Sequence, residues 1–241
     1  MENFTMSSRS LRRVERLEKA QPATNKSRTK RSTTRRIEEL IRDPYVWATR
    51  HTKTRNEHWR EENRPSPYEP FPQVVFLAAL FEAFDHEKVV WIEKSRDLMV
   101  SWACVAYLTF HAMTVPARGV VFQTQKEEKV VQLVEYAKCL WEHQDQILKD
   151  AFPLAKPRSL QSSRTLVFEN GSYIMGIPGG ADQLRSYHPW GYLSDEASFQ
   201  AEAGESYNES LSVVSGKIIF NSSAGPGWYA DARHDIMRTE E

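Results

Sequence analysis

Three short stretches of this 241-residue chain gather charged and polar side chains of complementary chemistry. The stretch Lys94-Ser95-Arg96-Asp97-Leu98-Met99-Val100-Ser101-Trp102 places two cations ahead of a serine. Two adjacent acids, Asp195-Glu196, and the small polar run Asn221-Ser222-Ser223 follow later in the chain. Cations neutralise phosphate charge, a serine hydroxyl and one acid can ligate Mg²⁺, and a second acid can polarise an attacking water. Together these residue types indicate a phosphate-handling site.

The stretch from residue 94 to residue 102 departs from the usual phosphate-binding loop. The pattern GxxxxGK[ST] requires glycine at positions 94 and 99 and lysine at 100, where this chain has Lys94, Met99 and Val100. Ser101 nevertheless occupies the position of the Mg²⁺-binding hydroxyl. Lys94, at the start of the loop, can still extend to the phosphates, with Arg96 as a second cation. A strand, turn and helix with ordinary surface cations explains the same residues, so both interpretations stay open.

Two other residues are candidates for nucleotide contacts. Gln73 follows the aromatic, proline-rich run Tyr68–Pro72, and an amide beside an aromatic ring can recognise an adenine base; a simple domain entrance is the alternative. Arg185 lies in the glycine-containing segment 177–188 and can present a cation to a phosphate, within the chain or across a subunit boundary. A surface arginine in a loop is the other interpretation. Adjacent acids and Gly/Pro-rich turns are also common, so Asp195-Glu196 and Asn221-Ser223 are weak signals when taken singly.

The elements that must position these residues alternate between strands and helices. Apolar β-rich runs predict the strands, and amphipathic or wholly apolar runs predict the helices. Asn170-Gly171 predicts the tight turn of a β-hairpin. The expected strands cover 88–93, 119–123, 165–169, 172–176, 191–194 and 217–221, and the expected helices cover 73–84, 101–114 and 126–148. This order predicts an α/β fold with a parallel-rich central sheet flanked by helices, with ligands at the carboxyl ends of the strands.

The N-terminal part of the chain differs in charge from the rest. Residues 1–60 carry 16 Lys and Arg against 7 Asp and Glu, a net charge of +9, although the whole chain has net charge 0. We expect residues 1–35 to be largely flexible with a short helix near 11–20, and 35–60 to be helical. The basic run suits an electrostatic grip on DNA phosphates, but a solvated tail is equally compatible. Prolines at 65, 67, 70 and 72 break helix and sheet, and predict a basic N-terminal region over 1–64 and a second domain over 65–241.

Composition excludes several classes of protein. With 40% hydrophobic and 11% aromatic residues the chain is not expected to be disordered, and two cysteines do not make a disulfide scaffold. Cys104 and Cys139 lie in apolar helical settings and are expected to be buried thiols in a reducing compartment. No apolar run approaches the 18 residues of a membrane span, and no signal peptide is visible.

The order and spacing of these motifs resemble the ATPase domain of bacteriophage large terminases, the motors that package viral DNA, over about residues 65–230. Residues 94–102 look like that family's deviant Walker A loop, in which the lysine moves to the start. Leu193-Ser194-Asp195-Glu196 looks like its Walker B strand and catalytic acid, and Asn221-Ser222-Ser223 like its coupling motif. Gln73 resembles its adenine-binding motif. Arg185 matches the place where several members carry an arginine that reaches a neighbouring subunit's nucleotide.

The resemblance implies a P-loop ATPase of the RecA-like class with ATP and Mg²⁺ as its cofactors. Backbone N–H groups of 95–101 would bind the phosphates, Lys94 and Arg96 would neutralise them, and Ser101 with Asp195 would hold Mg²⁺. Glu196 would activate water and Arg185 would stabilise the transition state. The implied partners are double-stranded DNA, further copies in a ring, the portal protein and the small terminase subunit, in the host cytoplasm at the procapsid.

Two other functions remain open at this stage. Family members usually continue into a nuclease domain, which we do not expect in this chain, so no nuclease activity is predicted. Met99 and Val100 also fit a non-enzymatic DNA-binding assembly protein with a degenerate P-loop. A different RecA-like ATPase, such as a helicase, is the second alternative.

Overall fold

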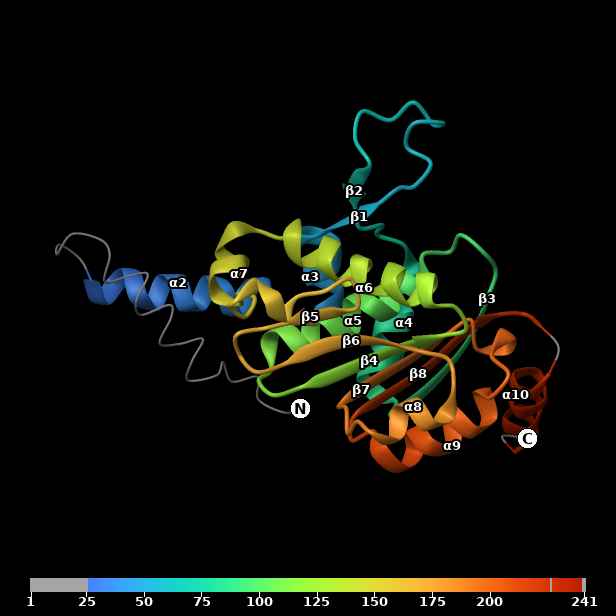
Figure 1. The fold of residues 1–241 in the computed structure, drawn as a ribbon. Helices are drawn as coiled ribbons and strands as arrows, with labels where there is room; N and C mark the ends of the chain where they lie inside the picture. The colour runs from blue at the N-terminus through green and yellow to red at the C-terminus, as the bar shows by residue number, and fades with distance from the viewer. Residues whose placement is uncertain (1–25, 226, 240–241) are drawn as a thin grey trace.

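The computed structural model describes residues 26–225 and 227–239, and its centre is a six-stranded sheet (Figure 1). The strand order is β3-β8-β7-β4-β6-β5, in which all neighbours are parallel except the edge pair β5–β6. The sheet consists of β3 (Val89–Lys94), β4 (Gly119–Thr124), β5 (Thr165–Val167), β6 (Tyr173–Pro178), β7 (Gly191–Asp195) and β8 (Lys217–Ser223). The predicted α/β class and parallel-rich sheet are confirmed.

Helices cover both faces of this sheet. The described helices are α2 (Lys26–Leu40), α3 (Pro44–His51), α4 (Val75–His86), α5 (Val100–Thr114), α6 (Glu127–Glu142), α7 (Gln146–Ala151), α8 (Ala181–Arg185), α9 (Ala203–Val213) and α10 (Trp228–Thr239), with short 3-10 turns at Arg158–Leu160 and Ala197–Phe199. In Figure 1, α3 to α7 lie on one side of the sheet and α8 and α9 on the other. The chain thus forms a three-layer sandwich.

Alternating side chains of the strands build two hydrophobic cores, one on each face. Val120 and Phe122 of β4 join the core under α3 to α7, whereas Val121 between them joins the core under α8 and α9. This period of two is the geometry of a strand buried on both faces. Helix α5 is buried along almost its whole length against the sheet, as its apolar sequence predicted. Both cysteines, Cys104 and Cys139, are free and buried, as expected.

The hairpin β5–β6 turns at Asn170-Gly171, where Gly171 has a φ of 87°. This left-handed conformation favours glycine, so the predicted turn chemistry is confirmed.

The predicted helix 126–148 is wrong in its length, because the chain leaves α6 at His143 and begins α7 at Gln146. Between them the buried Gln144 side chain accepts a hydrogen bond from Trp47 Nε1 at 3.1 Å. The break between the two helices thus contains a buried tertiary hydrogen bond that the sequence pattern does not show.

A two-stranded arm stands out from the helical layer above the sheet (Figure 1). It comprises β1 (Lys53–Arg55) and β2 (Tyr68–Pro70), which pair antiparallel, and the turns between them. The prediction of helix throughout 35–60 is therefore wrong after residue 51, and the prediction that the prolines exclude strand pairing is wrong at β2. Pro70 ends an isolated edge strand, which is where proline is tolerated. The expected division after residue 64 stays a prediction, and the helix expected near 11–20 lies outside the described residues.

Within the ranges 26–225 and 227–239, no helix combines the length and apolar character that crossing a membrane requires.

Candidate active site

Three parallel strands bring the predicted chemical groups to one edge of the sheet. Lys94 ends β3 and is in register with Ser223 of β8, while Asp195 ends β7 and is in register with Asn221 of β8. Parallel strands end at the same edge, so residues more than 90 positions apart in sequence become neighbours. The site is therefore a direct consequence of strand order.

The loop after Lys94 turns sharply before α5 begins at Val100. Two non-glycine residues of this loop have left-handed backbone conformations: Asp97 has a φ of 62° and Met99 a φ of 58°. Met99 is also the N-cap of α5. Such a conformation costs an L-residue roughly 1–2 kcal/mol, and turns of this kind aim consecutive N–H groups at an anion. The loop thus adopts a turn in which glycine would be expected, although residues 94–101 contain no glycine.

Ser101, Asp195 and Asn221 form a hydrogen-bonded group at the start of α5. The Ser101 hydroxyl lies 3.0 Å from Asp195 Oδ1, and Asn221 Nδ2 donates to the same carboxylate oxygen. Burial, and to a smaller degree the neighbouring Glu196, raise the pKa of Asp195 to about 6, although Lys94, Ser101 and Asn221 act to lower it. The carboxylate is therefore a destabilised charge that a cation would stabilise.

Lys94 and Glu196 form an ion pair across the mouth of the site. Lys94 Nζ lies 3.2 Å from Glu196 Oε1, and the lysine side chain is only 10% exposed. Glu196 has a φ of 54°, the third left-handed residue at this edge. Strained backbone of this kind concentrates at functional sites. The side chain that would activate water is thus held by the side chain that would neutralise phosphate.

These groups border a cleft of about 1110 Å³. Its walls are residues 54–58 of the arm, 96–102 of the loop and α5, 124–126 after β4, and 195–196 after β7, with side chains of α6. Of the predicted loop residues, Lys94, Arg96, Asp97, Leu98, Met99, Val100, Ser101 and Trp102 line the cleft and Ser95 does not. The volume is at the upper end for a small-molecule site.

The donor set fits a magnesium ion that is bound jointly with a nucleotide. Among the described residues no group of three or more His, Cys, Asp or Glu gathers that would hold a metal alone. Mg²⁺ typically takes one or two protein oxygens and completes its shell with phosphates and water, as Asp195 and Ser101 would allow. Asn221 Oδ1 and Ser223 Oγ are buried here without a hydrogen-bond partner. Such orphaned groups suit a site that gains ordered water, which can donate to Asn221 Oδ1 and accept from the Ser223 hydroxyl.

Five other predicted residues lie outside the described lining of the cleft, namely Gln73, Arg185, Asn221, Ser222 and Ser223. Gln73 is exposed in the segment before α4. Of its aromatic neighbours, Phe71 is 1% exposed and Tyr68 stacks on His143 with ring centroids 3.9 Å apart. Ser222 accepts a hydrogen bond from the Ser198 amide, and Ser223 lies opposite Lys94.

Arg185 is the fifth predicted residue that does not line the cleft. It is exposed at the end of α8, where its guanidinium lies 2.9 Å from Glu209 and 3.0 Å from Asp182. A contact with this chain's own cleft is not made in the structure.

Three contributors to the site, namely the arm, Tyr136 and Gln200, have no recognisable signal in the sequence. The arm forms one wall, and Tyr136 of α6 contributes another, with its ring stacked on Trp102 at 3.9 Å and 17°. Gln200, also missed, donates to Ser194 Oγ and to the carbonyl of Asp195, and so fixes the end of β7. The i, i+3 and i+4 apolar stripe of α6 marks it as a core helix, and only the fold shows that one edge faces a ligand.

Comparison with solved structures finds proteins of similar fold. The large terminase of bacteriophage HK97 superposes with a TM-score of 0.58 at 10% sequence identity, covering 72% of this chain and 38% of that chain. The Thermus phage P74-26 large terminase ATPase domain gives a TM-score of 0.47 at 13% identity, over 74% of this chain and 73% of that one. No family model matches the sequence. No curated protein matches it either.

The fold is therefore that of a phage large terminase, which confirms the resemblance at the level of architecture. This chain spans about 38% of the length of the HK97 protein.

Proposed function

We propose that this chain is the ATP-hydrolysing motor part of a phage large terminase, which drives double-stranded DNA into a procapsid. The observation that carries the proposal is the meeting of Lys94, Ser101 and Asp195 at one cleft. The HK97 fold supports it. The portal protein, the small terminase subunit and further copies in a ring are the partners this function requires, and the procapsid in the host cytoplasm is its place of action.

The cleft residues have distinct roles in this proposal. The N–H groups of the loop and of the start of α5 bind the phosphates, since a helix N-terminus attracts anions. Lys94 and Arg96 neutralise charge, and Ser101 and Asp195 would hold Mg²⁺. When bound, the ion supplies charge stabilisation on the phosphate oxygens.

Glu196 is the residue proposed to orient and deprotonate the attacking water. Its ion pair with Lys94 keeps the carboxylate engaged in the structure as described. A triphosphate competes for the lysine, because a phosphate chain carries more negative charge than one carboxylate. Nucleotide binding would therefore release Glu196 for its task, which ties hydrolysis to an occupied site.

Arg185 is proposed to act on the nucleotide of an adjacent subunit. It is exposed on α8, away from the lining of its own cleft. Its partners Glu209 and Asp182 hold the guanidinium at the surface, where a neighbouring copy can reach it. An arginine that reaches transition-state charge in this way raises turnover by roughly 10³–10⁵-fold.

The competing function is a DNA-binding assembly protein without catalysis. Only the absence of glycine and lysine at positions 99 and 100 favours it, and the left-handed Met99 preserves the turn that glycine usually makes. Measuring Mg²⁺-dependent release of phosphate from ATP, with and without duplex DNA, separates the two. DNA-stimulated release supports the motor; binding of DNA with no hydrolysis supports the assembly protein. A helicase would in addition separate the strands of a tailed duplex, which is measured in a separate unwinding assay.

The basic N-terminal region is proposed to contact DNA phosphates. Residues 26–36 contain six Lys and Arg and no acid. Binding dominated by phosphate contacts weakens steeply with salt. A binding series from low to high salt therefore tests this role, and affinity that is insensitive to salt contradicts it.

A further inference from the structure

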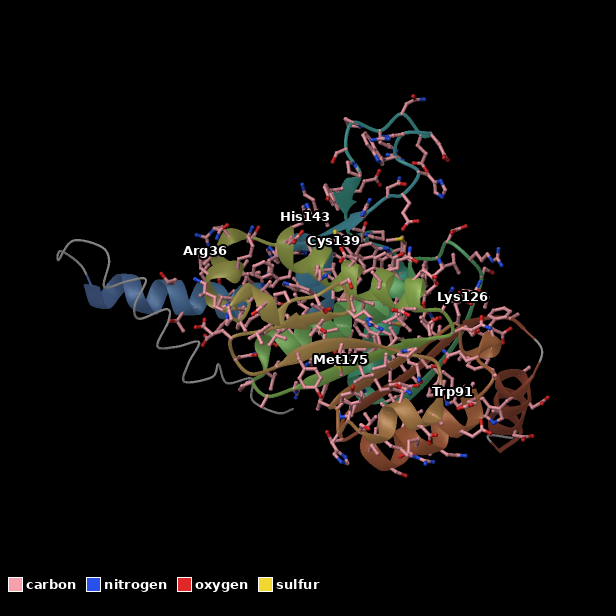
Figure 2. All side chains as sticks on the ribbon, in the orientation of Figure 1. Arg36, Trp91, Lys126, Cys139, His143 and Met175 are labelled. Carbon is pink, nitrogen blue, oxygen red and sulfur yellow. The ribbon has the colours of Figure 1, made fainter. Side chains whose placement is uncertain are left out.

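The arm is fixed to α6 at two points that bracket Arg55. The Cys139 thiol donates to the Lys53 carbonyl at 3.7 Å, and Gln132 Nε2 donates to Glu57 Oε1 at 2.7 Å. Figure 2 shows Cys139 and His143 beneath the base of the arm. Residues 132 and 139 are about two helical turns apart, so the segment 53–57 lies along α6. Arg55 is at its middle, level with Tyr136.

A third contact steadies the other strand of the arm. Tyr68, the register partner of Arg55, stacks on His143 at the end of α6 with ring centroids 3.9 Å apart. An isolated two-stranded ribbon is marginally stable in water. The position of Arg55 therefore depends on these attachments to α6, which hold it over the cleft in advance of any ligand.

Arg55 differs from the other charged residues of the arm that line the cleft. Glu57 is bound by Gln132, His58 pairs with Glu61, and Glu62 and Glu69 pair with Arg64. Arg55 is exposed, lines the cleft and makes no ion pair or side-chain hydrogen bond with any described residue. A guanidinium with five donors, carried on an anchored strand and without an acceptor among the described residues, is suited to bind an anion.

Tyr136 connects the surroundings of Arg55 to the predicted metal ligands. Its ring stacks on Trp102, the residue after Ser101. Burial raises the pKa of Tyr136, Glu57 and Asp195 raise it further, and Arg55 lowers it. The Tyr136 phenol therefore interacts electrostatically both with Arg55 and Glu57 of the arm and with Asp195.

The strand order decides which end of a nucleotide faces the arm. Along the sheet edge Lys94 of β3 comes first, then Asp195 of β7, and then β4, which leads into α6. Lys126, at that last position, lies beside the loop in Figure 2. A phosphate chain that runs from the start of α5 toward Asp195 and Glu196 presents its terminal phosphate to the side formed by α6 and the arm.

We propose that Arg55 binds the terminal phosphate of a nucleoside triphosphate in this cleft, as a cation supplied by the same chain from its arm. The inference rests on the proposed nucleotide-binding function and adds a phosphate-contacting residue to it. It also assigns the arm a purpose, which is to distinguish a triphosphate from a diphosphate.

The test compares Arg55→Gln with the control Lys53→Gln. Both residues are exposed cations of β1, but only Arg55 lines the cleft. Binding of a non-hydrolysable ATP analogue and of ADP, each with Mg²⁺, is measured by calorimetry on the full chain. A charge-assisted hydrogen bond corresponds to about a ten- to hundredfold change in affinity. We expect Arg55→Gln to weaken the triphosphate analogue by about that factor and to leave ADP unchanged, Lys53→Gln to change neither, and Arg55→Lys to recover part of the loss.

The outcomes distinguish failure of this inference from failure of the proposed nucleotide-binding function. If the wild-type chain binds neither nucleotide, the proposed function fails and Arg55 has no phosphate to bind. If the wild type binds both and Arg55→Gln binds them equally well, the function stands and the inference is overturned. Equal weakening of ADP and the triphosphate analogue also overturns it, because the contact is then not to the terminal phosphate. A loss confined to duplex DNA binding assigns Arg55 to a nucleic-acid backbone and overturns it as well.

Discussion

Lys94 and Glu196 are separated by 102 positions in sequence, yet their charged atoms lie 3.2 Å apart. In the proposed function the pair joins two roles that ATP hydrolysis requires, charge neutralisation by Lys94 and activation of water by Glu196. Because the lysine is nearly buried and the glutamate is about one-third exposed, the glutamate has the greater freedom to move when the pair is broken. This relationship leads directly to the first prediction.

Glu196→Gln should retain ATP binding and lose hydrolysis. The amide cannot accept a proton from water, and removing a general base typically lowers the rate by about 10²–10⁴-fold. Lys94 is no longer held by a carboxylate, so affinity for ATP should be equal to or higher than that of the wild type. Single-turnover hydrolysis with a parallel binding titration measures both. Hydrolysis at the wild-type rate would mean that the base is another residue.

Arg185→Ala should abolish turnover and leave nucleotide affinity nearly intact, because the residue lies outside its own cleft. The expected loss is roughly 10³–10⁵-fold in turnover. Mixing this variant with Glu196→Gln sharpens the test. A ring of both subunits regains complete sites in which a cleft with Glu196 faces a neighbour with Arg185. Activity that returns on mixing supports action between subunits, whereas no recovery points to a role within one chain.

Asn221→Ala should destabilise the protein more than Ser223→Ala, although both residues are in β8. Asn221 donates to the buried Asp195 carboxylate, whereas the buried Ser223 hydroxyl has no hydrogen-bond partner. Leaving a buried charged acceptor without its donor costs about 1–3 kcal/mol, and removing an unpaired hydroxyl costs little. Urea unfolding in the absence of nucleotide compares the two. Equal losses of stability would show that the Asn221 contact contributes nothing specific.

The stability of the chain should fall as pH is lowered from about 6.5 toward 3, in part through His111. Burial, with smaller contributions from Arg118 and Lys217, lowers the pKa of His111 to about 3. The unfolded chain therefore binds a proton that the folded chain does not. This group alone removes up to about 1.4 kcal/mol of stability per pH unit in that window, and its contribution is fully present above pH 6.5.

The control for this pH dependence is His111→Gln, which keeps a side-chain acceptor for Arg118. Urea unfolding of both proteins at pH 7, 6, 5 and 4 gives the slopes. The variant should be less stable than the wild type at pH 7 and lose less stability on acidification. Parallel slopes would assign the acid sensitivity to other groups.

The parts of the site that sequence reasoning found are those that lie at strand ends. Residues 94–101, 195–196 and 221 each follow or finish a recognisable strand, and parallel strands must end together. The arm could not be found in this way. Its sequence is charged and rich in proline, and Glu57 meets Gln132 across 75 positions of chain. No local pattern encodes that contact.

Helix boundaries and the base-binding expectation show a second limit. The amphipathic pattern over 126–148 predicted one continuous helix, but α6 ends at Glu142, and the Gln144 side chain accepts a tertiary hydrogen bond from Trp47 in the break before α7. Gln73 and its aromatic neighbours have the residue types for adenine recognition, but Phe71 is packed in the core and Tyr68 holds the arm. Residue type alone does not reveal which aromatic rings are already engaged.

Met99 shows that the turn before α5 can form without glycine. Its left-handed backbone shows that the turn before α5 tolerates a side chain at an energetic cost of only about 1–2 kcal/mol, a loss that packing elsewhere readily offsets. Glycine at this place is therefore a preference rather than a requirement. The backbone conformation of the turn can persist when its sequence departs from the usual pattern, so structural comparison can detect a similarity that a sequence pattern misses.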